Sequence, residues 1–98
     1  MADSESPHIL SGEATVTTAG TAVALSASKR VKSITIRAKA ANTGQIYVGG
    51  RSVDNTVNDG LDATESVTFE TVEWMDMADL FVDADVSGEG VDYYAVKA

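Results

Sequence analysis

The chain has 98 residues, of which 44% are hydrophobic and only 6% aromatic, and this fits one small domain with an aliphatic core. Its formal net charge of −8 argues against nucleic acid and against an anionic membrane as partners, because both need clustered Lys and Arg. The chain has no cysteine, which excludes disulfides, thiolate metal sites and cysteine nucleophiles.

The acidic excess has two interpretations. A dense carboxylate surface repels itself at low salt and is screened at high salt, which favours a salt-loving source. An ordinary acidic protein of a mesophile is the alternative. The first ten residues lack the basic and apolar regions of a signal peptide, and no apolar run approaches the roughly 18 residues of a membrane span. We therefore expect a protein made in the cytoplasm and not secreted by a signal peptide.

Residues 1–12 are predicted to form a polar N-terminal arm, and residues 13–98 a single β-domain. The arm carries the only proline and the only histidine of the chain, Pro7 and His8. Residues 13–18 and 21–26 alternate with a period of two on either side of Ala19-Gly20, which predicts a two-residue hairpin.

The stretch VKSITIRAKA at residues 31–40 has the clearest strand pattern, with Ile34, Ile36 and Ala38 on one face. After a turn at residues 42–44, the same alternation predicts that Ile46 and Val48 point inward and Tyr47 outward. Residues 51–63 are polar and contain turn signals, so we expect a surface loop there, with Leu61 tucked back.

Residues 65–74 place Val67 and Phe69 on one face and Val72 and Trp74 on the other, which indicates a bulge or strand end near residues 70–71. The following MDMADL suggests one helical turn. Residues 80–86 then alternate again, with Asp83 and Asp85 predicted to face solvent. A last strand closes the chain at residues 91–98. About seven short strands without a convincing helix predict an all-β fold, either a small antiparallel β-sandwich or a closed barrel.

The segment DADVSGEG at residues 83–90 begins like the calcium loop of an EF-hand. Asp83, Asp85 and Ser87 occupy the first three ligand positions, and Gly88 the bend. The twelfth position, which should be a bidentate Glu, is Tyr94, and the flanking segments are predicted strands. We therefore expect a solvated acidic face and a hairpin loop, and the three side chains stay only a weak metal candidate.

Other motifs carry little chemistry. The single His8 has no recognisable catalytic partners, and a domain of this size leaves little room for a deep cleft, so neither an enzyme nor a bound cofactor is expected. The basic residues at positions 29, 30 and 32 are interpreted as a solvated strand end, or as a contact with an acidic neighbour. Trp74 is interpreted as core filling first and as a binding anchor second.

The run VTTAGTAVALSASKRVKSITIRAKAANTGQIYVGG, the polar loop that follows it, and the closing LFVDADVSGEGVDYYAVKA resemble small β-sandwich structural proteins of tailed bacterial and archaeal viruses. The resemblance covers residues 16–97. It implies a virion component without catalytic residues, most simply a decoration or cement protein on the outer surface of the head. The acidic composition would then indicate a virus of a salt-loving archaeon.

The resemblance also implies partners: the major capsid protein or other virion proteins, and further copies of the chain. A receptor- or glycan-binding module of a head spike or tail is the alternative, and a small hydrolase with paired carboxylates is a third possibility. The glycan alternative predicts that Tyr47, Trp74 and Phe81 gather near loops. The residues we expect at a partner interface are apolar or aromatic, together with the arm histidine: His8, Ile9, Leu10, Tyr47, Trp74, Met75, Met77 and Phe81.

Overall fold

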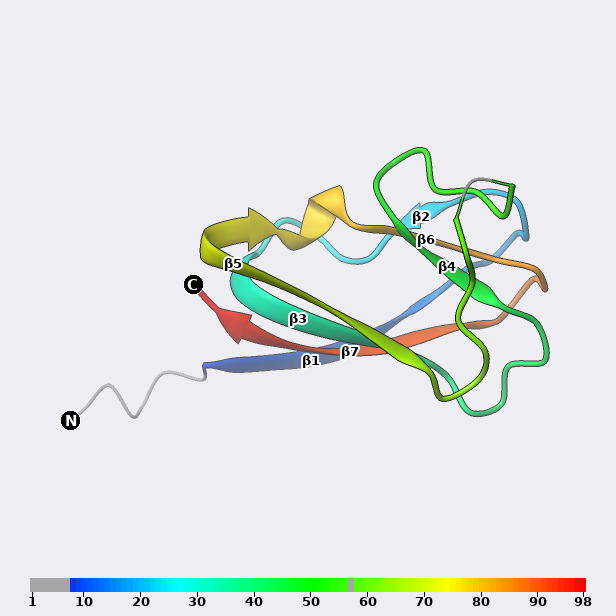
Figure 1. The fold of residues 1–98 in the computed structure, drawn as a ribbon, viewed down its shortest axis with the longest axis horizontal. Coiled ribbons are helices and arrows are strands. Elements are labelled where there is room, and N and C mark those ends of the chain that lie inside the picture. The colour runs from blue at the N-terminus through cyan, green and yellow to red at the C-terminus, as the bar shows by residue number, and fades with distance from the viewer. Residues whose placement is uncertain (1–7, 57) are drawn as a thin grey trace.

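The structure is a computed structural model, and it describes residues 8–56 and 58–98. Two antiparallel sheets pack face to face in an all-β fold (Figure 1). The larger sheet has the strand order β1-β7-β3-β5, and the smaller sheet has the order β2-β6-β4. The sheets are not closed into a barrel, so the predicted sandwich is confirmed and the barrel alternative is wrong.

The strands vary from two to eleven residues in length. A short 3₁₀ helix at Met77–Asp79 is the helical turn predicted from MDMADL. The strand bounds are β1 (Ile9–Thr15), β2 (Val23–Ala24), β3 (Arg30–Ala38), β4 (Ile46–Gly49), β5 (Ser66–Asp76), β6 (Phe81–Ala84) and β7 (Gly90–Lys97).

Every connection between consecutive strands crosses from one sheet to the other, because the odd-numbered strands form the larger sheet and the even-numbered strands the smaller one. The hairpin predicted around Ala19-Gly20 is therefore wrong: β1 pairs with β7, and β2 pairs with β6. The turn itself exists, since Gly20 has a φ of 89° and the Thr21 amide donates to the Thr18 carbonyl. The hairpin predicted at residues 87–90 is wrong in the same way, because β6 and β7 lie in different sheets.

The core lies between the two sheets and is almost entirely aliphatic. On β3 the predicted face of Ile34, Ile36 and Ala38 is buried. Val31 is buried as well, although it has the opposite parity, because a bulge between Val31 and Ser33 reverses the alternation. The fully buried side chains with the largest volumes are Val16, Val31, Ile34, Ile36, Ile46, Met77, Val82 and Val91.

The described parts of the loop after β4, residues 50–56 and 58–61, lie over the outer side of the smaller sheet. A Cβ added to Gly60 would lie 2.8 Å from Cε1 of Tyr47, and the Leu61 amide donates to the Ile46 carbonyl. Leu61 thus turns back onto the core, as predicted. The same loop makes two predictions wrong, because it covers side chains that the alternation placed in solvent. Tyr47 is only 6% exposed, and Asp83 is only 5% exposed.

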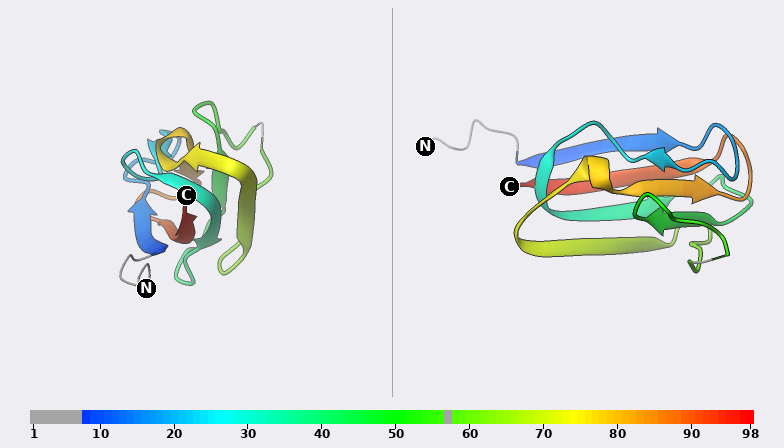
Figure 2. Two further views of the ribbon diagram at one scale, coloured as in Figure 1. Left: turned by 90° about the vertical axis from the view of Figure 1, so that its left-hand side faces the viewer. Right: turned by 90° about the horizontal axis from the view of Figure 1, so that it is seen from above.

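The larger sheet begins earlier than expected, because β1 starts at Ile9 and not after residue 12. The rest of the predicted arm, residues 1–7, lies outside the described residues. The register places Ile9, Val96, Ser33 and Glu70 in one row across the sheet. We call this the terminal end, since β1 begins and β7 ends there (Figures 1 and 2). The turns at residues 16–22, 39–45 and 85–89 lie at the opposite, loop end (Figure 1).

No helix among the described residues is long and apolar enough to cross a membrane.

Candidate interaction surface

The DADVSGEG segment holds the loop end together. Its alternate side chains accept hydrogen bonds from two turns that lie far away in the sequence. Asp83 Oδ1 accepts from the Gly20 amide at 2.9 Å, and Ser87 Oγ accepts from the Ala19 amide at 2.9 Å. These two side chains anchor the turn between β1 and β2.

Asp85 and Glu89 anchor the second turn, which joins β3 to β4. The Gln45 amide, at the end of this turn, donates to Asp85 Oδ2 at 3.3 Å, and the Tyr47 hydroxyl of β4 donates to the same carboxylate at 3.0 Å. Glu89 accepts from the amides of Gly44 and Thr43, and these backbone hydrogen bonds hold the pKa of the Glu89 carboxyl below its usual value. Burial, and then the hydrogen bond to Asp85, raises the pKa of Tyr47.

These hydrogen bonds explain why the segment carries polar and acidic side chains at the spacing of a metal-binding loop: the side chains anchor two turns. Asp83 lies on the outer side of the smaller sheet, but it is covered there and only 5% exposed, which corrects the prediction for that residue. Among residues 8–56 and 58–98, no three His, Cys, Asp or Glu side chains are grouped so that they could hold a metal ion. A hollow of about 270 Å³ does lie beside Asp54, Asp83 and Asp85. Two of these carboxylates already accept the hydrogen bonds that anchor the turns.

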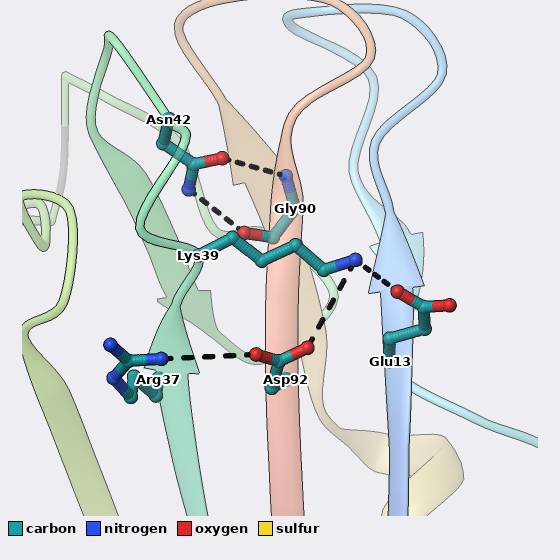
Figure 3. Close-up of polar contacts among 6 residues, drawn as sticks. All are labelled: Glu13, Arg37, Lys39, Asn42, Gly90 and Asp92. Atoms are coloured by element: carbon teal, nitrogen blue, oxygen red, sulfur yellow. Dashed lines mark hydrogen bonds and ion pairs between the residues drawn. The ribbon is translucent and has the colours of Figure 1, made fainter.

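The exposed face of the larger sheet carries a small lattice of opposite charges (Figure 3). Lys39 contacts Glu13 on β1 and lies 4.0 Å from Asp92 on β7, while Arg37 lies 3.9 Å from the other oxygen of Asp92. The contact with Lys39 lowers the pKa of Glu13, and the same contact raises the pKa of Lys39. All four side chains are partly exposed, so the pairs balance charge more than they stabilise the fold.

Charge is distributed unevenly between the two parts of the fold. The four strands of the larger sheet, together with Lys39, carry as many acidic as basic residues. The whole net charge of −8 therefore belongs to the rest of the chain. The balanced set consists of Glu13, Glu70, Glu73, Asp76 and Asp92 with Arg30, Lys32, Arg37, Lys39 and Lys97.

The same sheet exposes most of the large apolar side chains that remain in solvent. Val72 is 95% exposed, Ile9 is 60% and Tyr94 is 58%. Ile9 on β1 lies directly opposite Val96 on β7, which is also exposed. Trp74 is half-exposed, and the guanidinium carbon of Arg30 lies 4.3 Å from the centre of its ring. These residues define the apolar surface discussed below: Ile9, Val72, Trp74, Tyr94 and Val96.

The structure divides the predicted interface residues into three groups: exposed, buried and partly buried. His8 and Ile9 are exposed at the start of β1, and Trp74 is half-exposed on β5, against the first interpretation of core filling. Tyr47 and Met77 are buried, so neither can meet a partner while the fold is intact. Leu10 and Met75 pack against the core, and Phe81 is half-buried with Arg51 5.4 Å from its ring centre.

Three members of the apolar surface, Val72, Tyr94 and Val96, were not among the predicted interface residues. The register between β3 and β5 confirms the irregularity expected near residues 70–71, because Ser33 opposes Glu70 while Val31 opposes Met75. The irregularity does not turn Val72 inward, since it keeps the outward orientation of Glu70. The alternation along β5 already placed Val72 on the same exposed face as Glu70, but an apolar residue is usually expected to face the core.

Comparisons with known proteins give no relative: the chain matches no protein-family model, no curated protein and no solved structure.

Proposed function

We propose that the protein is a non-enzymatic structural component of a virion, a decoration or cement protein that binds the outer surface of a tailed-virus head. The observation that carries the proposal is the apolar surface on the charge-balanced sheet of a small, otherwise acidic sandwich. Several exposed apolar side chains on one sheet are typical of a protein interface, and the resemblance of residues 16–97 to virion proteins supports a capsid as the partner.

The charge distribution fits adhesion in salt. Apolar contacts persist at high ionic strength, while the acidic remainder of the chain is screened. The larger sheet can approach another protein without bringing net charge with it. Many copies on one particle would add weak single contacts into stable attachment. A salt-loving host is part of this proposal, on the ground of the net charge of −8.

The glycan- or receptor-binding alternative has less support. It required Tyr47, Trp74 and Phe81 to present their rings together. Tyr47 is buried, while the other two rings each have an arginine of the chain stacked against them. A sugar would have to displace Arg30 or Arg51 before it could stack on those faces.

The copy number of the chain in purified particles tests the virion role. Particles of the virus that carries the gene are purified in molar salt, and the chain is quantified by mass spectrometry against the major coat protein. We expect one copy for each coat subunit or for each few subunits. A few copies per particle would favour a tail component, and absence from the particles would overturn the proposal.

The surface itself is tested by re-binding. Particles are stripped of the protein at low salt and then incubated with purified protein in molar salt. The double variant Val72→Ser and Trp74→Ser should bind at least about tenfold more weakly, because it removes two exposed apolar anchors. The matched control is Val86→Ser, an exposed apolar residue outside the larger sheet, which should bind like the wild type. Equal binding by the double variant and the wild type would show that another surface is used.

A further inference from the structure

The outer edge of β1 is open among the described residues, because β1 is the last strand of the larger sheet on that side. The Lys97 amide donates to the His8 carbonyl and the Val16 amide to the Glu89 carbonyl, so even-numbered residues bond to β7. By the alternation of an antiparallel ladder, the odd-numbered residues point their amide and carbonyl groups away from β7. These are Ile9, Ser11, Glu13 and Thr15.

This edge lacks the usual protection against pairing with another chain. Natural edge strands carry proline, lysine or an unbalanced charge, or they are very short. β1 has seven residues, and its sequence ILSGEAT contains no proline and no lysine. Its one charged residue, Glu13, is bound by Lys39 of the same molecule. Among the residues that the structure describes, the edge is therefore a nearly neutral row of unpaired backbone groups.

The distribution of charge favours a second copy of the chain as the partner that pairs with this edge. Two molecules of net charge −8 repel one another wherever their acidic parts meet. The larger sheet is charge-balanced, so two copies can approach through it with the least repulsion. Ile9, Tyr94 and Val96 add apolar side chains beside the edge on β1 and β7. An edge that pairs with itself also matches donors to acceptors by symmetry.

We propose that two copies of the protein pair antiparallel through β1, joining their larger sheets into one continuous sheet. In the register that pairs all four open residues, the twofold axis passes beside Gly12, so that Gly12 of one copy lies opposite Gly12 of the other. Neither residue has a side chain that could clash there. It forms about eight main-chain hydrogen bonds. Ile9 then lies opposite Thr15 of the second copy, and Ser11 lies opposite Glu13, whose carboxylate accepts from the Ser11 hydroxyl.

This inference is independent of the virion role, because it concerns only the self-association of the purified chain. The first measurement is the mass by light scattering at about 0.1 M and about 1 M NaCl, where the screening length falls from ~10 to ~3 Å. We expect twice the 10.2 kDa monomer mass, with tighter association at the higher salt. A monomer in both conditions, or a trimer, overturns the proposal.

A charge swap tests the register. Ile9→Lys with Thr15→Lys places two pairs of like charges opposite each other across the twofold axis. Ile9→Lys with Thr15→Glu places opposite charges there instead. Both positions have exposed side chains, so both variants should fold. At about 0.1 M salt we expect the Lys/Lys variant to dimerise at least about tenfold more weakly than the Lys/Glu variant. Equal association of the two variants contradicts this register.

A backbone test does not depend on charge. Ser11→Pro removes an amide that points away from β7, so it should block pairing with the second copy and leave the β1–β7 ladder intact. The matched control, Ser11→Thr, keeps that amide and should remain dimeric. Circular dichroism and thermal unfolding verify that each variant is folded. A folded Ser11→Pro variant that stays dimeric shows that the copies meet elsewhere.

Discussion

Asp83 is a buried carboxylate in a strand where the alternation predicted a solvated one. Its Oδ1 accepts hydrogen bonds from the amides of Gly20 and Ala84, at 2.9 and 2.7 Å. Asp54 and Asn55, from the loop after β4, line a hollow together with Asp83. The Asp83 carboxylate therefore gives the Gly20 amide the hydrogen-bond acceptor that a carbonyl of a neighbouring strand would otherwise supply.

Replacing Asp83 with Ala should lower the free energy of unfolding by roughly 1–2 kcal/mol, because the Gly20 amide loses its acceptor. Asp83→Asn keeps an oxygen acceptor at the same position and should cost less. Urea unfolding of both variants measures the difference. Equal losses for Asn and Ala would show that the charge of Asp83, and not its hydrogen bond, stabilises the turn.

At this scale the alternation of polar and apolar residues predicted side-chain direction well on β3 and poorly on the smaller sheet. Ile34 and Ile36 face the core as expected, since the other face of β3 is open to solvent. Tyr47 and Asp83 are buried because their sheet is covered on both sides. A period of two reveals one buried face, and it contains no information about a loop that folds over the other.

The elements themselves were predicted, while their partners were not. Strict alternation between the two sheets means that no strand pairs with its neighbour in sequence. Turn residues such as Ala19-Gly20 show that the chain reverses, but a reversal within one sheet and a crossing between two sheets use the same residues. Only the distant acceptors, Asp83 and Ser87 for this turn, distinguish the two cases.

The close contact between β7 and β1 predicts that an alanine destabilises the fold far more at Gly90 than at Gly50. A Cβ on Gly90 would overlap the carbonyl oxygen of Ala14, a backbone atom of β1 that cannot move aside. Gly90→Ala should therefore destabilise the fold by about 1–3 kcal/mol or more. Gly50 has no neighbouring atom within 4 Å of the same position, so Gly50→Ala should stay within about 0.5 kcal/mol of the wild type.

Thermal or urea unfolding of the two glycine variants measures this contrast. If Gly90→Ala is as stable as Gly50→Ala, then β1 and β7 are not held as closely as the structure shows at Ala14.

On the scale of the whole molecule, the separation of charge decides the response to salt. The larger sheet is balanced, and the excess of acids belongs to the rest of the chain. Repulsion among them opposes folding at low salt and is screened at high salt. The ion pairs on the larger sheet weaken with the same screening, but exposed pairs contribute little.

We expect the midpoint of thermal unfolding to rise from about 0.01 M to about 1 M NaCl, between which the screening length falls from ~30 to ~3 Å. A double variant, Asp59→Asn and Asp79→Asn, removes two exposed carboxylates for which the structure shows no hydrogen bond or ion pair among the described residues. It should show a smaller rise. A midpoint that is independent of salt would contradict the halophilic interpretation of the composition.

The sequence by itself determined the class of fold, the aliphatic core and the acidic character of this protein. These properties depend on composition and on local periodicity, and both are legible along a single chain. The tertiary structure alone decided which strands pair, why DADVSGEG carries its acids, and which apolar residues remain exposed. Each of these depends on segments that are distant in sequence: Asp83 acts on Gly20, Glu89 on Gly44, and Ile9 stands beside Val96. Local patterns cannot encode such contacts, because the same alternation fits either sheet and either neighbour.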